Sequence, residues 1–295
     1  MNGCCQARDS LAAMLAAALA LASSLSWGLS DFLGGLQSRR HPLLAVLVLS
    51  QGFALVVLAA AVMAGAPTEH DAAATAWAAG SGVLGVAGLT AFYRALAIGT
   101  MSIVAPLSAT GAVIPVLVGL ASGERPRAVQ VVGIALAMVG VVLAGREAAE
   151  PDAQARRTAR IAVLLALLAA VGFGSFFVGI ERAQRSGDVA WVLLAARAPE
   201  VLLLVAACVI RRPRLRSTAG AFGAIAAIGV FDLLANLLFV LASARGLLSV
   251  VGVLGALYPA VTVLLARALL HERLTPTQDA GVLVTLAGVV ALAAG

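Results

Sequence analysis

The residues of this chain best suited to chemistry are carboxylates inside long apolar segments. Asp232 lies near the middle of the segment 219–243, and Asn236 follows it at i+4, so both side chains project from one helix face. A carboxylate at that depth in a membrane is strongly disfavoured unless it is paired, faces water or is protonated. Asp232 is therefore a candidate substrate or proton site on a cavity wall, and the alternative is a structural contact between helices. Asp31 is the second candidate for proton coupling.

Basic side chains inside apolar segments are the natural partners of these carboxylates. Arg94 and the adjacent Tyr93, near the end of the segment 77–98, are candidate substrate-binding residues. An Arg94–Asp232 pair is one arrangement, and extension of the Arg94 side chain to the membrane interface is the other. Arg197 and Glu200 are three residues apart, so they are expected to neutralise each other along one helix in a structural role.

Aromatic residues near Asp31 suggest the wall of a cavity. Trp27 precedes Asp31 by four residues, and the positions 146 residues later are Phe173 and Phe177. Rings at repeated positions, together with Tyr258, are suited to an apolar or cationic ligand. The alternative is that these rings serve packing or the interfacial belt, where aromatic residues are common in membrane proteins.

Prolines within the apolar segments are expected to act as hinges or kinks, because proline removes a backbone hydrogen bond and leaves a carbonyl free. The hinge candidates are Pro106, Pro115, Pro199 and Pro259.

The composition indicates an integral membrane protein. The chain is 62% hydrophobic and 12% charged, and its mean hydropathy is +1.03, so a bilayer must be most of its solvent. The basic residues are all Arg and lie mainly in short connections, which favours anionic lipid headgroups over nucleic acid as neighbours. A plasma-membrane, multi-pass protein is expected.

A duplicated stretch organises the chain. Residues 99–145 and 246–295 have Gly, Ser and Gln at matching positions. They also share a Glu-Arg pair, which starts at Glu124 in the first copy and at Glu272, 148 residues later, in the second. Both glutamates end apolar spans, so they are expected to cap helices or pair with other loops, not to bind substrate.

Each copy contains five apolar spans, and the fold class expected is an all-α integral membrane protein. The expected spans are about 11–35, 43–65, 77–98, 102–121, 128–145, 160–181, 189–210, 219–243, 247–270 and 278–294. The repeats are 11–145 and 160–295, joined by a loop at 146–159. Because five is odd, the second repeat enters the membrane from the opposite side, which predicts ten helices in two inverted repeats.

The chain resembles the drug/metabolite transporter superfamily in its EamA-like branch. The motifs that carry the resemblance are Ser26-Trp27-Gly28, Tyr93-Arg94-Ala95-Leu96, Val104-Ala105-Pro106-Leu107, Gly123-Glu124-Arg125 and His271-Glu272-Arg273. In the last motif, His271 stands where the family usually has Gly. The resemblance implies ten helices, alternating access and movement of a small molecule, often export of a metabolite or drug, without naming one substrate.

The leading hypothesis is a secondary active exporter of a small metabolite or drug-like molecule, with a proton as the coupling ion. The alternatives are a polytopic membrane enzyme acting on a lipid and a passive channel. The sequence has no HExxH motif, paired-aspartate metal motif or glycine-rich phosphate loop. A non-enzyme with no cofactor and no metal site is therefore expected, and the oligomeric state stays open.

The orientation has two conflicting indications. With the ten expected spans numbered in chain order, the connections 1–2, 5–6, 7–8 and 9–10 lie on one side of the membrane and carry 11 Arg residues. The termini and the connections on the other side carry 6. Basic residues near span ends favour the cytoplasm, so this bias predicts that both termini lie outside. The family resemblance implies the reverse, with both termini in the cytoplasm.

Overall fold

The computed structural model describes residues 2–121, 128–144, 153–212, 219–243, 254–255 and 257–294. Within these ranges the chain is helical and contains no strand, and an isolated bridge joins His70 to Gly187. The prediction of an all-α membrane protein is confirmed. Six of the described helices are long and apolar enough to cross a bilayer, and the other crossings are shorter or interrupted.

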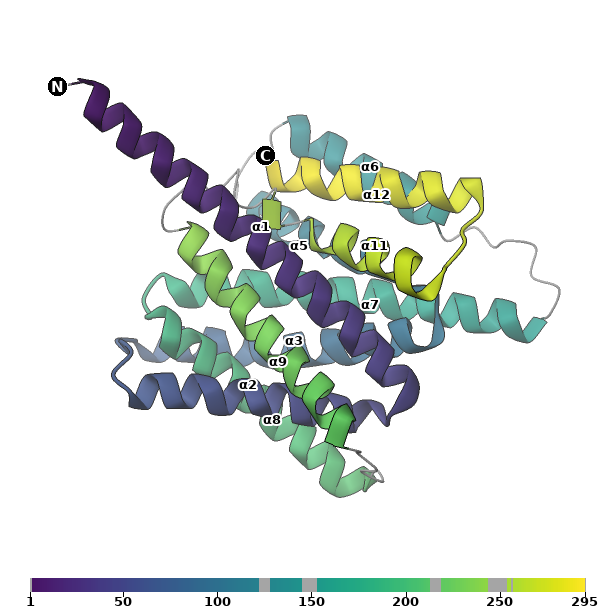
Figure 1. Ribbon diagram of the computed structural model, residues 1–295, viewed down its shortest axis with the longest axis horizontal. Helices are drawn as coiled ribbons and strands as arrows, with labels where there is room; N and C mark the ends of the chain where they lie inside the picture. Colours follow the sequence, from purple (N-terminus) through teal and green to yellow (C-terminus); the bar gives the residue numbers. More distant parts are fainter. Residues whose placement is uncertain are drawn as a thin grey trace.

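The helices follow the expected spans closely (Figure 1). Their bounds are α1 Asn2–Arg40, α2 Leu43–Met63, α3 Ala72–Ile98, α4 Met101–Ala109, α5 Val113–Ala121, α6 Ala128–Ala144, α7 Ala153–Gln184, α8 Val189–Arg211, α9 Ala219–Ser243, α11 Tyr258–Leu270 and α12 Pro276–Ala294. A short 3-10 helix, η1 (Thr110–Ala112), interrupts the fourth crossing between α4 and α5.

Loop contacts agree with the ten-helix topology, in which the connections 2–3 and 6–7 share one face. The backbone N–H of Glu69 donates to the Asp188 carboxylate at 2.8 Å, and the N–H of Asp188 donates to the Glu69 carbonyl at 2.7 Å. The ring of His70 stacks on Trp191 with centroids 3.8 Å apart.

Asp71 caps the start of α3. The backbone N–H of Ala74 donates to the Asp71 carboxylate, and this hydrogen bond lowers the pKa of that group.

Helices of one repeat pack mainly against helices of the other repeat. Helix α1 packs against α9 and α3 packs against α7, so the first helix of each repeat lies on the third helix of the other (Figure 1). Ser23 and Ser30 of α1 fix the first of these pairs, because their hydroxyls donate to backbone carbonyls of α9 at 2.7 Å and 3.0 Å. Helices α6 and α12, the last of each repeat, pack on each other.

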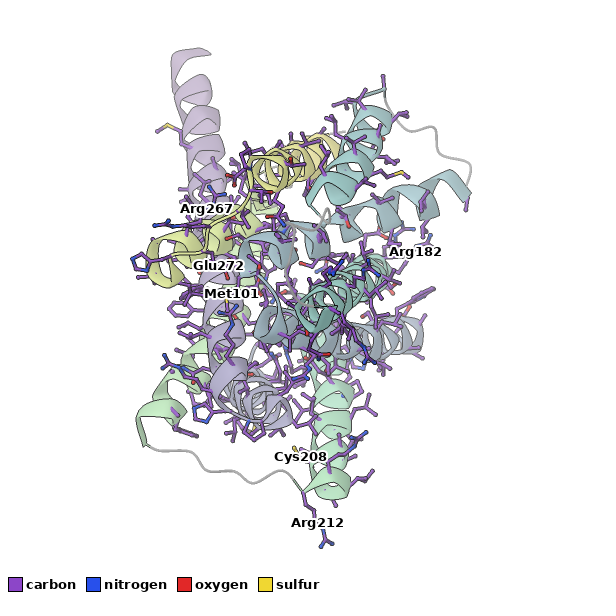
Figure 2. All side chains as sticks on the ribbon, turned by 90° about the vertical axis from the view of Figure 1, so that its right-hand side faces the viewer. Met101, Arg182, Cys208, Arg212, Arg267 and Glu272 are labelled. Carbon is purple, nitrogen blue, oxygen red and sulfur yellow. The ribbon has the colours of Figure 1, made fainter. Side chains whose placement is uncertain are left out.

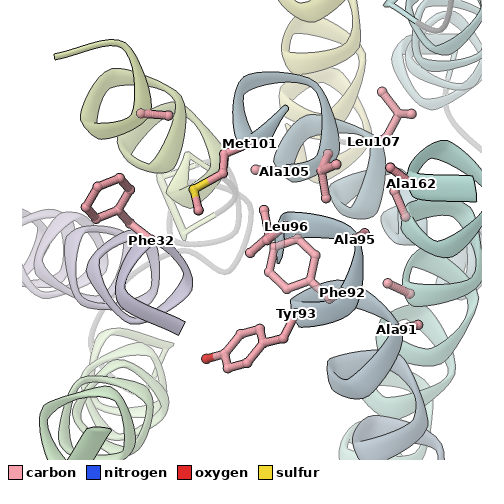
Figure 3. Close-up of a cluster of buried hydrophobic side chains, with 14 of the residues drawn as sticks. Phe32, Ala91, Phe92, Tyr93, Ala95, Leu96, Met101, Ala105, Leu107 and Ala162 are labelled. Atoms are coloured by element: carbon pink, nitrogen blue, oxygen red, sulfur yellow. The ribbon is translucent and has the colours of Figure 1, made fainter. Parts of the chain in front are cut away.

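The main hydrophobic cluster lies where α3, α4 and α7 meet α1 (Figure 3). Phe92, Leu96, Met101 and Leu107 are fully buried there, beside small alanines such as Ala162 that allow close helix approach. This cluster holds α3 rigidly behind the cavity described below.

Glycines set the closest helix contacts, and two of them on α3 provide a matched test. A methyl group at Gly82 would overlap the backbone carbonyl of Ala196 on α8, whereas one at Gly80 would meet nothing within 4 Å. We expect Gly82→Ala to destabilise the protein by about 1–3 kcal/mol through overpacking. Gly80→Ala should be neutral or stabilising by up to about 1 kcal/mol, since Ala is the better helix former. Thermal unfolding in one detergent measures both, and equal melting temperatures would contradict the close α3–α8 contact at Gly82.

The hinge candidates do not share one structural setting. Pro106 and Pro199 lie inside α4 and α8. Pro115 lies in α5, close after η1. Pro259 was expected to break a helix, but it lies in the first turn of α11, where the missing N–H has no intrahelical acceptor to lose. That expectation is therefore corrected.

Candidate functional site

A cavity of about 100 Å³ lies between the two repeats. Its wall combines acidic, aromatic and small residues from α1, α3, α7, α8, α9 and α11. The lining residues are Trp27, Asp31, Gly85, Leu89, Phe173, Phe176, Phe177, Arg197, Glu200, Asp232, Asn236 and Tyr258.

Most of the predicted site residues meet at this cavity. Trp27, Asp31, Asp232, Asn236 and Tyr258 all line it, although they are spread over three helices. The arrangement matches the expectation of a cavity wall built around Asp232, and binding of substrate by these residues stays a prediction.

Two predicted site residues lie elsewhere. Tyr93 is fully buried behind the cavity, with its ring packed so closely on α1 that a methyl group at Gly34 would overlap it. Arg94 is exposed on the outer surface of the helix. The proposed Arg94–Asp232 pair is wrong, because adjacent helical residues point about 100° apart, and burial of Tyr93 turns Arg94 outward.

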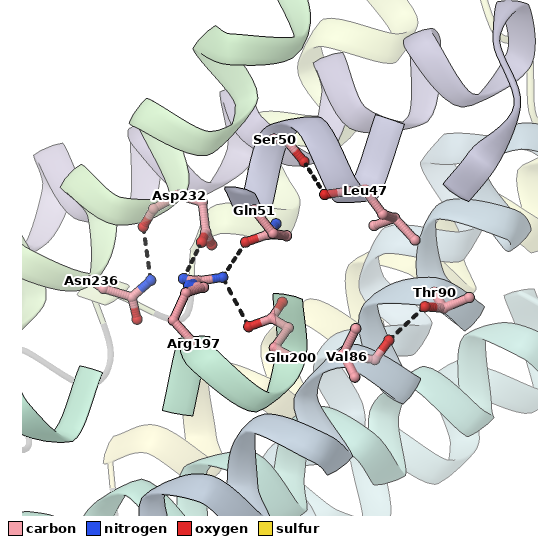
Figure 4. A network of polar contacts seen from close by, with 9 residues as sticks. All are labelled: Leu47, Ser50, Gln51, Val86, Thr90, Arg197, Glu200, Asp232 and Asn236. Atoms are coloured by element: carbon pink, nitrogen blue, oxygen red, sulfur yellow. Dashed lines mark hydrogen bonds and ion pairs between the residues drawn. The ribbon is translucent and has the colours of Figure 1, made fainter. Parts of the chain in front are cut away.

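The actual partner of Asp232 is Arg197, which organises a buried network (Figure 4). Its Nη2 donates to the Asp232 carboxylate at 2.7 Å, and its Nη1 donates to Glu200 at 3.1 Å and also to the side-chain oxygen of Gln51. The side chain of Arg197 is only 12% exposed. The network joins α2, α8 and α9, and the expected Arg197–Glu200 pair is confirmed as one part of it.

Asn236 bonds to the backbone beside the ion-pair network and not to its charged side chains. Its Nδ2 donates to the backbone carbonyl of Asp232 at 2.8 Å, one turn earlier on α9 (Figure 4). The bond uses one of the two amide hydrogens, so Asn236 can still offer its side-chain oxygen and its second N–H to the cavity.

Asp31 has a different environment from Asp232. It is only 9% exposed and lines the cavity. Among the residues that the structure describes, no hydrogen bond or ion pair reaches its carboxylate, whereas Asp232 is paired with Arg197. Asp31 is therefore the carboxylate on this wall that lacks a protein partner.

Aromatic rings share the cavity wall with Asp31. The ring of Trp27 lies 6.0 Å from that of Tyr258 in an edge-to-face contact, and Phe176 and Phe177 contact each other at 5.6 Å. Phe173 is held from behind by Phe92 at 5.5 Å. These contacts fix the rings as a preformed apolar surface.

A contact bridges the two repeats at one face of the molecule. Glu272, after α11, accepts hydrogen bonds from the backbone N–H groups of Met101 and Ser102 at 3.0 Å and 2.9 Å, so it caps the start of α4 (Figure 2). Arg39 reaches the same carboxylate at 3.5 Å and donates to the carbonyl of Gly99 at 2.9 Å. The expectation that Glu272 caps a helix and pairs with a loop is confirmed, and Glu124 lies outside the described residues.

At the opposite face, the described part of the equivalent contact is Arg185, because Glu124, which corresponds to Glu272, lies outside the described residues. Arg185, which stands 146 residues after Arg39, pairs with Glu181 on its own helix at 2.7 Å. Helices α7 and α9 have almost no contact along their described lengths, whereas their symmetry mates α1 and α3 pack together. The two repeats are thus arranged asymmetrically about the cavity.

Sequence reasoning missed Gln51 and the phenylalanine at 176. Gln51 is fully buried in the apolar span of α2. A single amide side chain in such a span could have indicated a buried polar contact. Phe176 carried no signal, because its neighbours Phe173 and Phe177 were selected only through the repeat spacing.

These features define a ten-helix membrane protein of the transporter type, with a central cavity between two related halves. The chain belongs to the EamA-like transporter family, whose model matches residues 14–146 and 160–294. The two matches confirm the duplication. No curated protein matches the chain.

A solved structure shares the architecture. A crystal structure described only as that of a protein superposes with a TM-score of 0.64 at 17% identity, covering 95% of this chain and 96% of its own. At that identity the likeness concerns the fold alone.

Proposed function

We propose that this protein is a secondary active exporter in the plasma membrane that moves a small metabolite or drug-like molecule by alternating access, coupled to protons. The observation that carries the proposal is the cavity between the repeats, with the carboxylate of Asp31 on its wall and no partner for it in the described chain. A buried carboxylate of this kind exchanges a proton for another cation as its surroundings change.

Alternating access is supported by the asymmetry between the two faces. The Glu272–Arg39 contact joins the repeats at one face. Helices α1 and α3 pack together, whereas their counterparts α7 and α9 have almost no contact along their described lengths. Inverted repeats can exchange these two arrangements, which would open the cavity to the other side. The export direction follows the activity that the family resemblance implies.

The test is transport by purified protein in liposomes with an imposed pH gradient and a pH-sensitive dye inside. We expect a transported compound from a metabolite and drug panel to collapse the gradient faster in protein-containing liposomes than in protein-free ones. Substrate movement without proton flux would indicate a passive channel or another coupling ion. Conversion of lipid into a new product, with no movement of any compound, would indicate the enzyme alternative.

A further inference from the structure

We propose that the cavity binds a positively charged organic molecule, with Asp31 opposite its charge and the surrounding aromatic rings against its sides. The inference rests on the proposed function, because it names the class of molecule that the transport cavity takes.

The first support is the state of Asp31. Its side chain is more than nine-tenths buried, faces the cavity and has no protein partner in the described chain. With a neutral occupant, this carboxylate would be desolvated and uncompensated unless it took up a proton. A cationic occupant supplies the missing charge.

The second support is the balance of charge on the wall. The lining contains three acids, Asp31, Glu200 and Asp232, and one base, Arg197. Both terminal nitrogens of Arg197 already donate within the protein, to Asp232, Glu200 and Gln51. An anionic occupant would therefore meet excess negative charge, and the one guanidinium on the wall is already bound to two carboxylates.

The third support is the aromatic surface beside Asp31. Trp27 lies one helical turn from Asp31 on α1, and Tyr258 packs on Trp27 from α11. The faces of aromatic rings attract cations, most strongly where water is excluded. Alkylated ammonium groups suit this setting, since their methyl groups contact the rings and their charge faces the carboxylate.

The experiment measures binding to the purified full chain in detergent by calorimetry and by thermal stabilisation. The probes are benzyltrimethylammonium, the neutral N,N-dimethylbenzamide and the anionic benzenesulfonate. We expect the cation to bind most tightly, and Asp31→Asn to weaken it roughly tenfold or more, as expected for one lost charge-assisted contact. Asp31→Glu should restore part of the affinity. Asp188→Asn, a loop carboxylate whose contact with the N–H of Glu69 an amide oxygen can replace, should leave it unchanged.

Other outcomes would overturn the inference. These are equal or tighter binding of the neutral or anionic probe, no binding of the cation, or unchanged cation affinity in Asp31→Asn. If that variant fails to fold, the ranking of the three probes on the unsubstituted protein still decides. Gradient-driven transport of an anion would overturn the proposed cation binding but would be consistent with a transporter. Cation binding without any transport would overturn the proposed function but would be consistent with the binding site.

Discussion

Arg197→Gln is expected to destabilise the protein by about 3 kcal/mol or more. The guanidinium of Arg197 is the base that the structure places between Asp232 and Glu200, at 2.7 Å and 3.1 Å from their carboxylates. Removing it leaves two carboxylates in a membrane interior without their partner, and loss of one member of a buried pair typically costs about 3–5 kcal/mol. Thermal unfolding in detergent and the monodisperse fraction after size exclusion measure the effect.

A matched control exists on the surface. Arg185→Gln breaks an ion pair with Glu181 in which both side chains are more than half exposed, so its effect should stay below about 0.5 kcal/mol. The double variant Arg197→Gln/Asp232→Asn should be more stable than Arg197→Gln alone, because one uncompensated charge is gone. If Arg197→Gln has the same melting temperature as Arg185→Gln, the network does not hold α2, α8 and α9 together.

Glu272→Ala is expected to shift the protein toward opening of the face at which Glu272 bridges the two repeats. The change removes the acceptor for the N–H groups of Met101 and Ser102 and the carboxylate that faces Arg39. Hydrogen bonds to a charged group contribute about 1.5–3 kcal/mol each. A differential loss of only about 1.4 kcal/mol already changes the ratio of the two states tenfold.

The distance between α1 and the loop after α11 reports this change. Spin labels at Arg40→Cys and Arg273→Cys, both exposed positions, require a background without the three native cysteines. We expect Glu272→Ala to add a population at longer distance and Glu272→Gln to add a smaller one, since the amide oxygen still accepts hydrogen bonds. Glu181→Ala, which removes a carboxylate paired within α7, serves as the control and should leave the distances unchanged. Identical distances in Glu272→Ala would mean that Glu272 only caps α4.

The wall of the cavity was largely predictable from spacing and repetition. Asp232 and Asn236 share a face at i+4, and Trp27 and Asp31 do so on α1, so each pair had to point one way. The duplication then placed Phe173 at the position equivalent to Trp27. Burial of a carboxylate in a membrane made an inward direction the favourable one.

The partners across the cavity were not predictable in the same way. Helical spacing says which residues share a face but not which helix lies opposite, so it could not choose Arg197 over Arg94 for Asp232. The choice depends on how α8 and α9 each pack on α2 near Gln51, which arises only from tertiary packing. The same holds for Glu272, whose sequence position marks the end of a helix but not which helix start it caps.

The exchange of partners between the repeats also sets an order of events at the ribosome. Ser23 on α1 hydrogen-bonds to the carbonyl of Ala235, 212 residues later in the chain. At about 5–20 residues per second, that acceptor is synthesised on the order of 10–40 seconds after Ser23. Throughout this interval the polar face of α1, with Ser23 and Ser30, has no native partner from α9. The insertion machinery must therefore shelter the first helix from lipid until most of the second repeat has been made.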